Sequence, residues 1–194
     1  MGSWCAGEDR AARVARAVGP DRTSRPVMPT PPWCVAAMLS HHRRCDTIFP
    51  MRWVFDTDVV VAGMRSPSGA SAALLLAALD RRVTLCANVA LMLEYEAVCA
   101  RPAHRAAAGL TPKEVAMFLD ALASLVEPVE THFLWRPQLR DPGDEMVLEA
   151  AVNGQAQAIV TFNARDFGVA AAQFGVDMLL PRQALAVLKG LSHE

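Results

Sequence analysis

From residue 51 to the end of the chain, short apolar runs alternate with stretches in which apolar residues recur at helical spacing. The apolar, β-prone runs predict strands over 53–61, 83–86, 125–129, 158–161 and 176–180. Strands that alternate with helices are typical of βαβ units and a parallel sheet. The pattern therefore predicts an α/β fold, a three-layer α/β/α sandwich with about four or five parallel strands at its centre.

The stretches between these runs carry helix start and stop signals. They predict helices over 70–79, 88–100, 111–125 and 141–153, and a closing helix from Pro181. Asn88 is a good N-cap, and Pro102 stops the helix that follows it. Thr111, Pro112 and Glu114 stand in capping-box order.

Residues 1–50 break this alternation. They hold six of the thirteen prolines and show no sustained apolar period, which predicts a mostly disordered extension with a short helix across Ala11–Val18. Met51 directly precedes the first strand and is an alternative start, in which case the first fifty residues are a gene-prediction artefact. We therefore assign residues 1–50 to an extension and residues 51–194 to one domain.

Composition and charge narrow the class of protein. The chain is 53% apolar, which is enough for a core, and its five scattered cysteines favour reduced thiols in a cytoplasmic protein. No apolar run approaches the roughly 18 residues that span a bilayer, so no membrane association is expected. Residues 1–50 hold seven Arg and four acids, about +3, and residues 51–194 hold twelve basic and sixteen acidic residues, about −4. The resulting net charge of −1 does not by itself indicate nucleic-acid binding.

Polar residues collect where the predicted sheet would present one edge. They follow strands or open helices: Asp56, Asp141, Asp144, Thr161, Asn163 and Asp166. Carboxyl ends of parallel strands and the helix starts after them meet at the same edge, where α/β proteins place their sites. Glu94 lies in the helix predicted over 88–100 with apolar neighbours at helical spacing, so we expect it to face inward.

Each acid also has an ordinary structural explanation. Asp56 could form an Asx turn, Asp141 and Asp144 could cap and start a helix, and Glu94 could be solvated. Together, however, so many negative charges in a small volume repel one another. A divalent cation resolves that repulsion, and oxygen ligands suit Mg²⁺ or Mn²⁺. Such a site is suited to phosphodiester hydrolysis.

These segments, from Arg52 to about Leu188, resemble PIN domains, and most of all the toxin components of toxin–antitoxin systems related to VapC ribonucleases. The matching motifs are Asp56-Thr57-Asp58 after an apolar strand, Glu94 ahead of Arg101-Pro102, the segment Arg140–Leu148, and Thr161-Phe162-Asn163-Ala164-Arg165-Asp166-Phe167. The resemblance leaves residues 1–50 unmatched.

The resemblance implies a Mg²⁺- or Mn²⁺-dependent endoribonuclease, the toxin of a type II toxin–antitoxin system. The catalytic, metal-binding acids would be Asp56, Glu94, Asp144 and Asp166, with Asp58, Asp141, Thr161 and Asn163 in support. Arg140 and Arg165 could hold RNA phosphates or pair with their acidic neighbours. The implied partners are RNA, a small antitoxin protein and a second copy of the chain.

Asp58 departs from this family, which has Asn at that position. An acid adds charge and cannot donate a hydrogen bond, which would raise the demand for metal or weaken activity. Asp56-Thr57-Asp58-Val59-Val60 also fits the Asp-x-Asp-x-Val opening of haloacid-dehalogenase-like phosphatases, with Asp56 as nucleophile. That reading needs a lysine in the site, and the only central one, Lys113, starts a surface helix. A third reading is a PIN-fold binding module whose activity has decayed.

Overall fold

The computed structural model describes residues 51–134 and 136–190, and within them five strands alternate with eight helices. The extension predicted over residues 1–50, with its helix at Ala11–Val18, lies outside the described residues. The strands are β1 (Met51–Phe55), β2 (Val83–Ala87), β3 (Glu127–Pro128), β4 (Ala158–Val160) and β5 (Asp177–Leu179).

The eight helices are α2 (Thr57–Arg65), α3 (Ala70–Leu79), α4 (Val89–Cys99), α5 (Pro102–Ala108), α6 (Pro112–Leu125), α7 (Glu145–Asn153), α8 (Ala164–Gln173) and α9 (Pro181–Gly190). None of these described helices is by itself long and apolar enough to cross a membrane. Only α2 and α3 taken together reach that length and composition, as a pair bent by 99°.

All five strands are parallel, in the order β3-β2-β1-β4-β5. The central strand β1 pairs with β2 on one side and with β4 on the other, so that Trp53 is in register with Leu85 and with Ala158. Trp53, Val54 and Phe55 are fully buried. Their burial on both faces of the sheet explains why β1 reads as a continuous apolar run.

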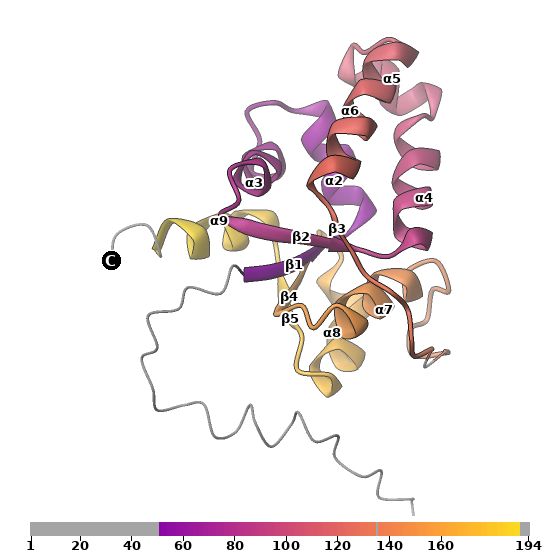
Figure 1. Cartoon of the computed structure of the whole chain (residues 1–194), viewed down its shortest axis with the longest axis vertical. Helices are drawn as coiled ribbons and strands as arrows, with labels where there is room; N and C mark the ends of the chain where they lie inside the picture. Colours follow the sequence, from indigo (N-terminus) through magenta and orange to yellow (C-terminus); the bar gives the residue numbers. More distant parts are fainter. Residues whose placement is uncertain (1–50, 135, 191–194) are drawn as a thin grey trace, which may run out of the picture. The chain divides into compact units, whose positions relative to one another are not determined.

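Helices cover both faces of this sheet, which confirms the predicted three-layer α/β/α arrangement (Figure 1). In the view of Figure 1, α2, α3, α4 and α6 lie above the strands, and α7 and α8 lie below them. Helix α7 packs against β1, β2 and β4, while α3 packs against β2 and α9. The apolar core fills the two interfaces between sheet and helices.

The strand predicted over 53–61 is wrong beyond Phe55, because residues 57–65 form α2. Asp56 is the N-cap of this helix. Val59, Val60 and Val61 are all buried, so an uninterrupted valine run that favours a strand instead fills the inner side of a helix. Tertiary burial outweighs the modest helix propensity of valine here.

The helix starts predicted at Asn88 and Thr111 are confirmed, whereas the helix predicted over 141–153 begins only at Glu145, without a side-chain cap. The Asn88 side chain caps α4, and Thr111 and Glu114 form the full capping box of α6. Pro102, expected only as a stop, also opens the short helix α5, where a proline at the first position loses no hydrogen bond. Gly109 ends α5 in the left-handed conformation, at φ 68°, that glycine adopts without strain.

Candidate active site at the carboxyl edge of the sheet

Asp56 stands directly after β1 and is only 7% exposed. Its Oδ1 accepts a hydrogen bond from the Thr57 backbone N–H at 2.7 Å, and its Oδ2 accepts one from the Thr161 hydroxyl at 2.6 Å. Burial raises the pKa of Asp56, the two hydrogen bonds lower it, and the charge of Asp166 raises it. The residue is therefore a buried carboxylate held in one orientation at a strand end.

Thr161 occupies the equivalent place after β4, the strand that lies beside β1. It is fully buried, and its hydroxyl donates to Asp56 while its oxygen accepts the Asn163 backbone N–H at 2.9 Å. The pairing of two strands thus joins residues that are 105 positions apart in the chain. Thr161 fixes both the Asp56 carboxylate and the turn that leads into α8.

Asp58 lies in the first turn of α2, one residue beyond Thr57. Its Oδ2 accepts the backbone N–H of Phe162 at 3.2 Å, whereas its Oδ1 is buried and has no hydrogen-bond partner. Burial first, and then the charge of Asp56, raise the pKa of Asp58 to about 6. A buried carboxylate oxygen without a partner is costly unless a proton or a cation reaches it.

Asp144 reaches the same region from α7. It stands at the N-cap position of that helix, but its side chain makes no capping hydrogen bond. Burial, followed by the charges of Asp56, Asp141 and Asp166, raises the pKa of Asp144 to about 6. The neighbouring Asp141 is exposed, and its Oδ1 accepts the Gly143 backbone N–H at 2.8 Å, so it shapes the turn before α7.

Asp166 and Asn163 belong to the start of α8 and are both exposed. Asn163 occupies the N-cap position without a side-chain capping bond. Asp166 acts on the site through its charge, since it raises the pKa values of both Asp56 and Asp144. The end of β1, the start of α7 and the start of α8 therefore bring Asp56, Asp144 and Asp166 into one electrostatic group.

Glu94 is not joined to that group by any contact. Its side chain is half-buried on α4, and it forms no hydrogen bond or ion pair with another described residue. It is also absent from the charges that raise the pKa values of Asp56, Asp58 and Asp144. The next residue does reach the site, because the Tyr95 hydroxyl donates to the carbonyl oxygen of Phe55. The assignment of Glu94 as a metal ligand stays a prediction.

The carboxylate oxygens at this edge are ligands that a hard divalent cation prefers, although the side chains do not form a compact cluster. Within residues 51–134 and 136–190, no three His, Cys, Asp or Glu side chains are close enough together to hold a metal ion. The acids nevertheless raise one another's pKa values, and the buried Oδ1 of Asp58 has no partner. Mutually repelling carboxylates and an unpaired buried oxygen form a set of oxygen donors that fits a hard divalent cation.

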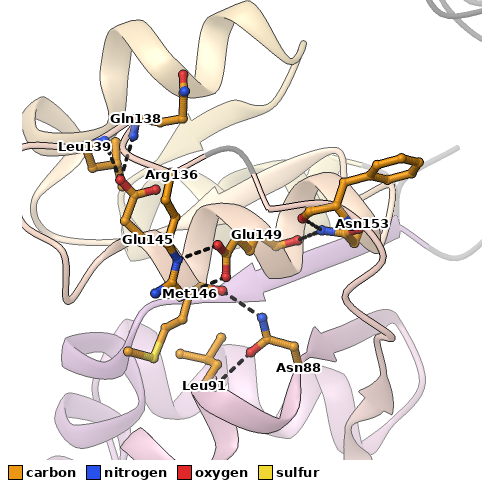
Figure 2. A network of polar contacts seen from close by, with 10 residues as sticks. Asn88, Leu91, Arg136, Gln138, Leu139, Glu145, Met146, Glu149 and Asn153 are labelled. Atoms are coloured by element: carbon orange, nitrogen blue, oxygen red, sulfur yellow. Dashed lines mark hydrogen bonds and ion pairs between the residues drawn. The ribbon is translucent and has the colours of Figure 1, made fainter.

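A second pair of acids, to which the sequence analysis gave no role, supports α7 (Figure 2). Glu145 is 2% exposed, and its Oε1 accepts the backbone N–H groups of Gln138 and Leu139 at 2.6 and 2.9 Å. Glu149 holds the Arg136 guanidinium through two bonds of 2.6 and 2.9 Å. These bonds fix the segment 136–139 on α7. The spacing of four residues among apolar neighbours was the available signal.

Asn88 and Asn153 complete the network drawn in Figure 2. The Asn88 amide donates to the Met146 carbonyl at 3.1 Å while its oxygen caps α4 at Leu91. Asn153 binds the backbone of Phe133 at the other end of α7. Hydrogen bonds therefore hold both ends of α7, the helix that presents Asp144.

Arg140 and Arg165 flank the acids and are both exposed. Neither forms an ion pair with an acid in the described part of the chain. Both guanidinium groups are therefore available to an anionic ligand.

Two hollows of the described region contain none of the predicted site residues. One, of about 490 Å³, lies between α4 and α6 and is lined by residues such as Val89, Met92, Leu93 and Leu119.

Comparison with known proteins identifies the family to which these residues belong. A family model described as the PIN domain matches residues 52–165. No match was found among curated proteins. A similar solved structure is VapBC2 from Rickettsia felis bound to a DNA fragment from their promoter, with 13% identity and a TM-score of 0.45, covering 66% of this chain and 97% of that one.

Proposed function

Because the chain belongs to the PIN domain family, whose members are typically nucleases that use divalent metals, we propose that it is a metal-dependent endoribonuclease. The observation that carries the proposal is the electrostatic group at the carboxyl edge of the sheet. Asp56 is buried there, and the charge of Asp166 raises its pKa and that of Asp144. Three acids from distant segments share one field, which is the arrangement that a cation-assisted hydrolase needs.

Asp56, Asp144 and Asp166 would hold Mg²⁺ or Mn²⁺, with Glu94 as a fourth ligand and Asp58 beside them. A bound cation of this kind lowers the pKa of a water and stabilises the negative charge of a leaving oxygen. The protein's own contribution is to fix the acids. Thr161 orients Asp56, the Glu145 and Glu149 contacts hold α7 in place, and Asp141 shapes the turn that presents Asp144.

The proposed substrate is RNA, held through its phosphates by Arg140 and Arg165. Both side chains are exposed beside the acids and are not engaged by another described acid. A guanidinium can take two phosphate oxygens at once. The cation would offset the repulsion between the phosphate and the carboxylates, so the basic side chains and the metal should each strengthen binding.

The phosphatase reading gains no support from the site. That reading needs a lysine in the site beside Asp56. Lys113 begins α6 and is exposed, and no hydrogen bond or ion pair joins it to Asp56 in the described part of the chain.

Replacement of Asp144 by Asn tests the proposal. The full-length protein is incubated with an end-labelled single-stranded RNA in Mn²⁺, in Mg²⁺ and in EDTA. Wild type should cut only with metal, and Asp144→Asn should lose more than the roughly 10–100-fold that follows loss of a residue merely supporting a metal ligand. Because the Asp144 side chain makes no capping bond, the circular dichroism spectrum of Asp144→Asn should match that of wild type. Asp120→Asn, an exposed acid of α6, serves as the matched control.

Two outcomes would contradict the proposal. One is equal cleavage by Asp144→Asn and wild type, and the other is wild-type cleavage that persists in EDTA. Wild type that binds RNA without cutting it would instead favour the decayed binding module.

We further propose that the protein is the toxin of a toxin–antitoxin pair, acts in the cytoplasm and forms a homodimer. What supports the toxin role is the resemblance of the motifs around Asp56, Glu94, Asp144 and Asp166 to those of PIN toxins. Induced expression should arrest growth, and co-expression of a short neighbouring gene should restore it. Growth arrest that Asp144→Asn still causes would contradict this role.

A further inference from the structure

Phe162 lies in the turn between β4 and α8, beside the acids that follow β1. It directly follows Thr161, whose hydroxyl holds Asp56, and its own N–H donates to Oδ2 of Asp58 at 3.2 Å. The next N–H, of Asn163, donates to Thr161 at 2.9 Å. One hydrogen bond of the Phe162 backbone and two of its chain neighbours thus hold this turn beside Asp56 and Asp58.

The side chain of Phe162 is 50% exposed in spite of this fixed backbone. Phe167, five residues later in α8, is by contrast fully buried. A single exposed apolar side chain is common and needs no explanation of its own. What distinguishes Phe162 is its place: its ring is half-exposed, its own N–H bonds Asp58, and the preceding residue, Thr161, bonds Asp56.

The polar surroundings of Phe162 identify the kind of ligand that the ring fits. Arg165 lies on the same turn into α8 and is exposed, so the turn offers one aromatic ring and one cation to solvent. This pairing matches a nucleotide, whose base stacks on an aromatic ring while its phosphate binds a basic group. Only unpaired bases are free to stack in this way, because those in a helix already stack on one another.

We propose that Phe162 is a stacking platform for an unpaired base next to the phosphate that is cut. The inference rests on the proposed ribonuclease function. A stacked base would fix the adjacent phosphate in front of Asp56 and Asp144. Loss of stacking on one aromatic ring should weaken binding of single-stranded RNA by about 5- to 150-fold.

The test measures binding apart from cleavage, in full-length Asp144→Asn protein with Mg²⁺. Fluorescence anisotropy of a labelled single-stranded RNA is recorded for Phe162→Leu, which keeps an apolar side chain, and for Phe162→Trp, which keeps the stacking surface. Phe162→Leu should weaken binding by the stated factor, and Phe162→Trp should match or exceed the parent. In the active protein, Phe162→Leu should raise KM more than it lowers kcat.

Phe133→Leu is the matched control. Phe133 is 61% exposed but is bound at the opposite end of α7 from Asp144, about 13 Å along a nine-residue helix. Its replacement should leave both binding and cleavage unchanged. An RNA carrying one abasic position beside the cleavage point should bind the parent and Phe162→Leu equally, because there is no base to stack.

The outcomes separate this inference from the function beneath it. If wild type cuts RNA and Phe162→Leu binds RNA as tightly as its Asp144→Asn parent does, the stacking role is wrong and the ribonuclease stands. If the binding of duplex RNA depends on Phe162 as strongly as the binding of single-stranded RNA does, the ring does not stack on an unpaired base and the stacking role is wrong. If wild type neither binds nor cuts RNA, both proposals fail.

Discussion

Replacing Asp58 by Asn should stabilise the metal-free protein, and the gain should grow with pH. Asp58 carries a buried Oδ1 without a partner, and its pKa is raised to about 6 from the ordinary 3.8 by burial and by Asp56. Asn has the same shape, keeps an oxygen for the Phe162 N–H, and cannot ionise. The substitution therefore removes a charge that the folded protein tolerates poorly.

The sign and size follow from proton linkage. Between pH 3.8 and about pH 6 the folded protein binds more protons at Asp58 than the unfolded chain does, so stability falls as pH rises through this window. At 1.36 kcal/mol per pKa unit, the full penalty above about pH 6 is about 3 kcal/mol. The substitution should recover only part of this penalty, for two reasons. The charges of Asp56 and Asp144 contribute to it, and the Asn amide takes the buried position of Oδ1. The net gain for Asp58→Asn should then be about 1–3 kcal/mol at pH 8 and close to zero at pH 4.

Urea unfolding followed by circular dichroism, in EDTA at pH 4, 6 and 8, measures the gain. Asp120→Asn makes the same chemical change at an exposed site and should alter stability by less than about 0.5 kcal/mol at every pH. Addition of Mn²⁺ at pH 8 should raise the stability of wild type more than that of Asp58→Asn, because a cation also relieves the charge. A gain that is independent of pH, or a loss of stability at pH 8, would refute the reasoning.

Two further substitutions test the supports of the site. Thr161→Val removes the hydroxyl that bonds Asp56 at 2.6 Å, and it leaves a buried oxygen of Asp56 and the Asn163 N–H unpaired. The free energy of unfolding should therefore fall by about 1–3 kcal/mol. Thr161→Ser keeps the hydroxyl and should lose less stability. Arg136→Met leaves the buried Glu149 carboxylate without its two bonds. Because Arg136 is half-exposed, we expect a loss of about 1–3 kcal/mol rather than that of a fully buried pair; a thermal melt unchanged from wild type would contradict it.

Local chemistry made several elements readable from the sequence. Asn88 and Thr111 satisfy the free N–H groups of the helix starts that they precede, and this depends only on residues three positions away. The boundary at Asp56 was not readable in the same way. The valines of α2 favour a strand locally, and only their burial within the fold makes them a helix. The supporting acids Glu145 and Glu149 were missed because their partners come from the irregular segment 136–139.

The sequence by itself determined the class of fold, the approximate places of the five strands and the set of acids from which a site could be drawn. These follow from apolar periodicity and capping, which act over a few residues. Only the tertiary structure decided which acids meet. The pairing of β1 with β4 places Thr161 on Asp56, and the packing of α7 and α8 brings the charges of Asp144 and Asp166 to it. Glu94 has no such contact. A matching motif fixes where a residue stands in the chain. It does not fix how far that residue lies from the other acids in the fold, and the effect of a charge depends on that distance.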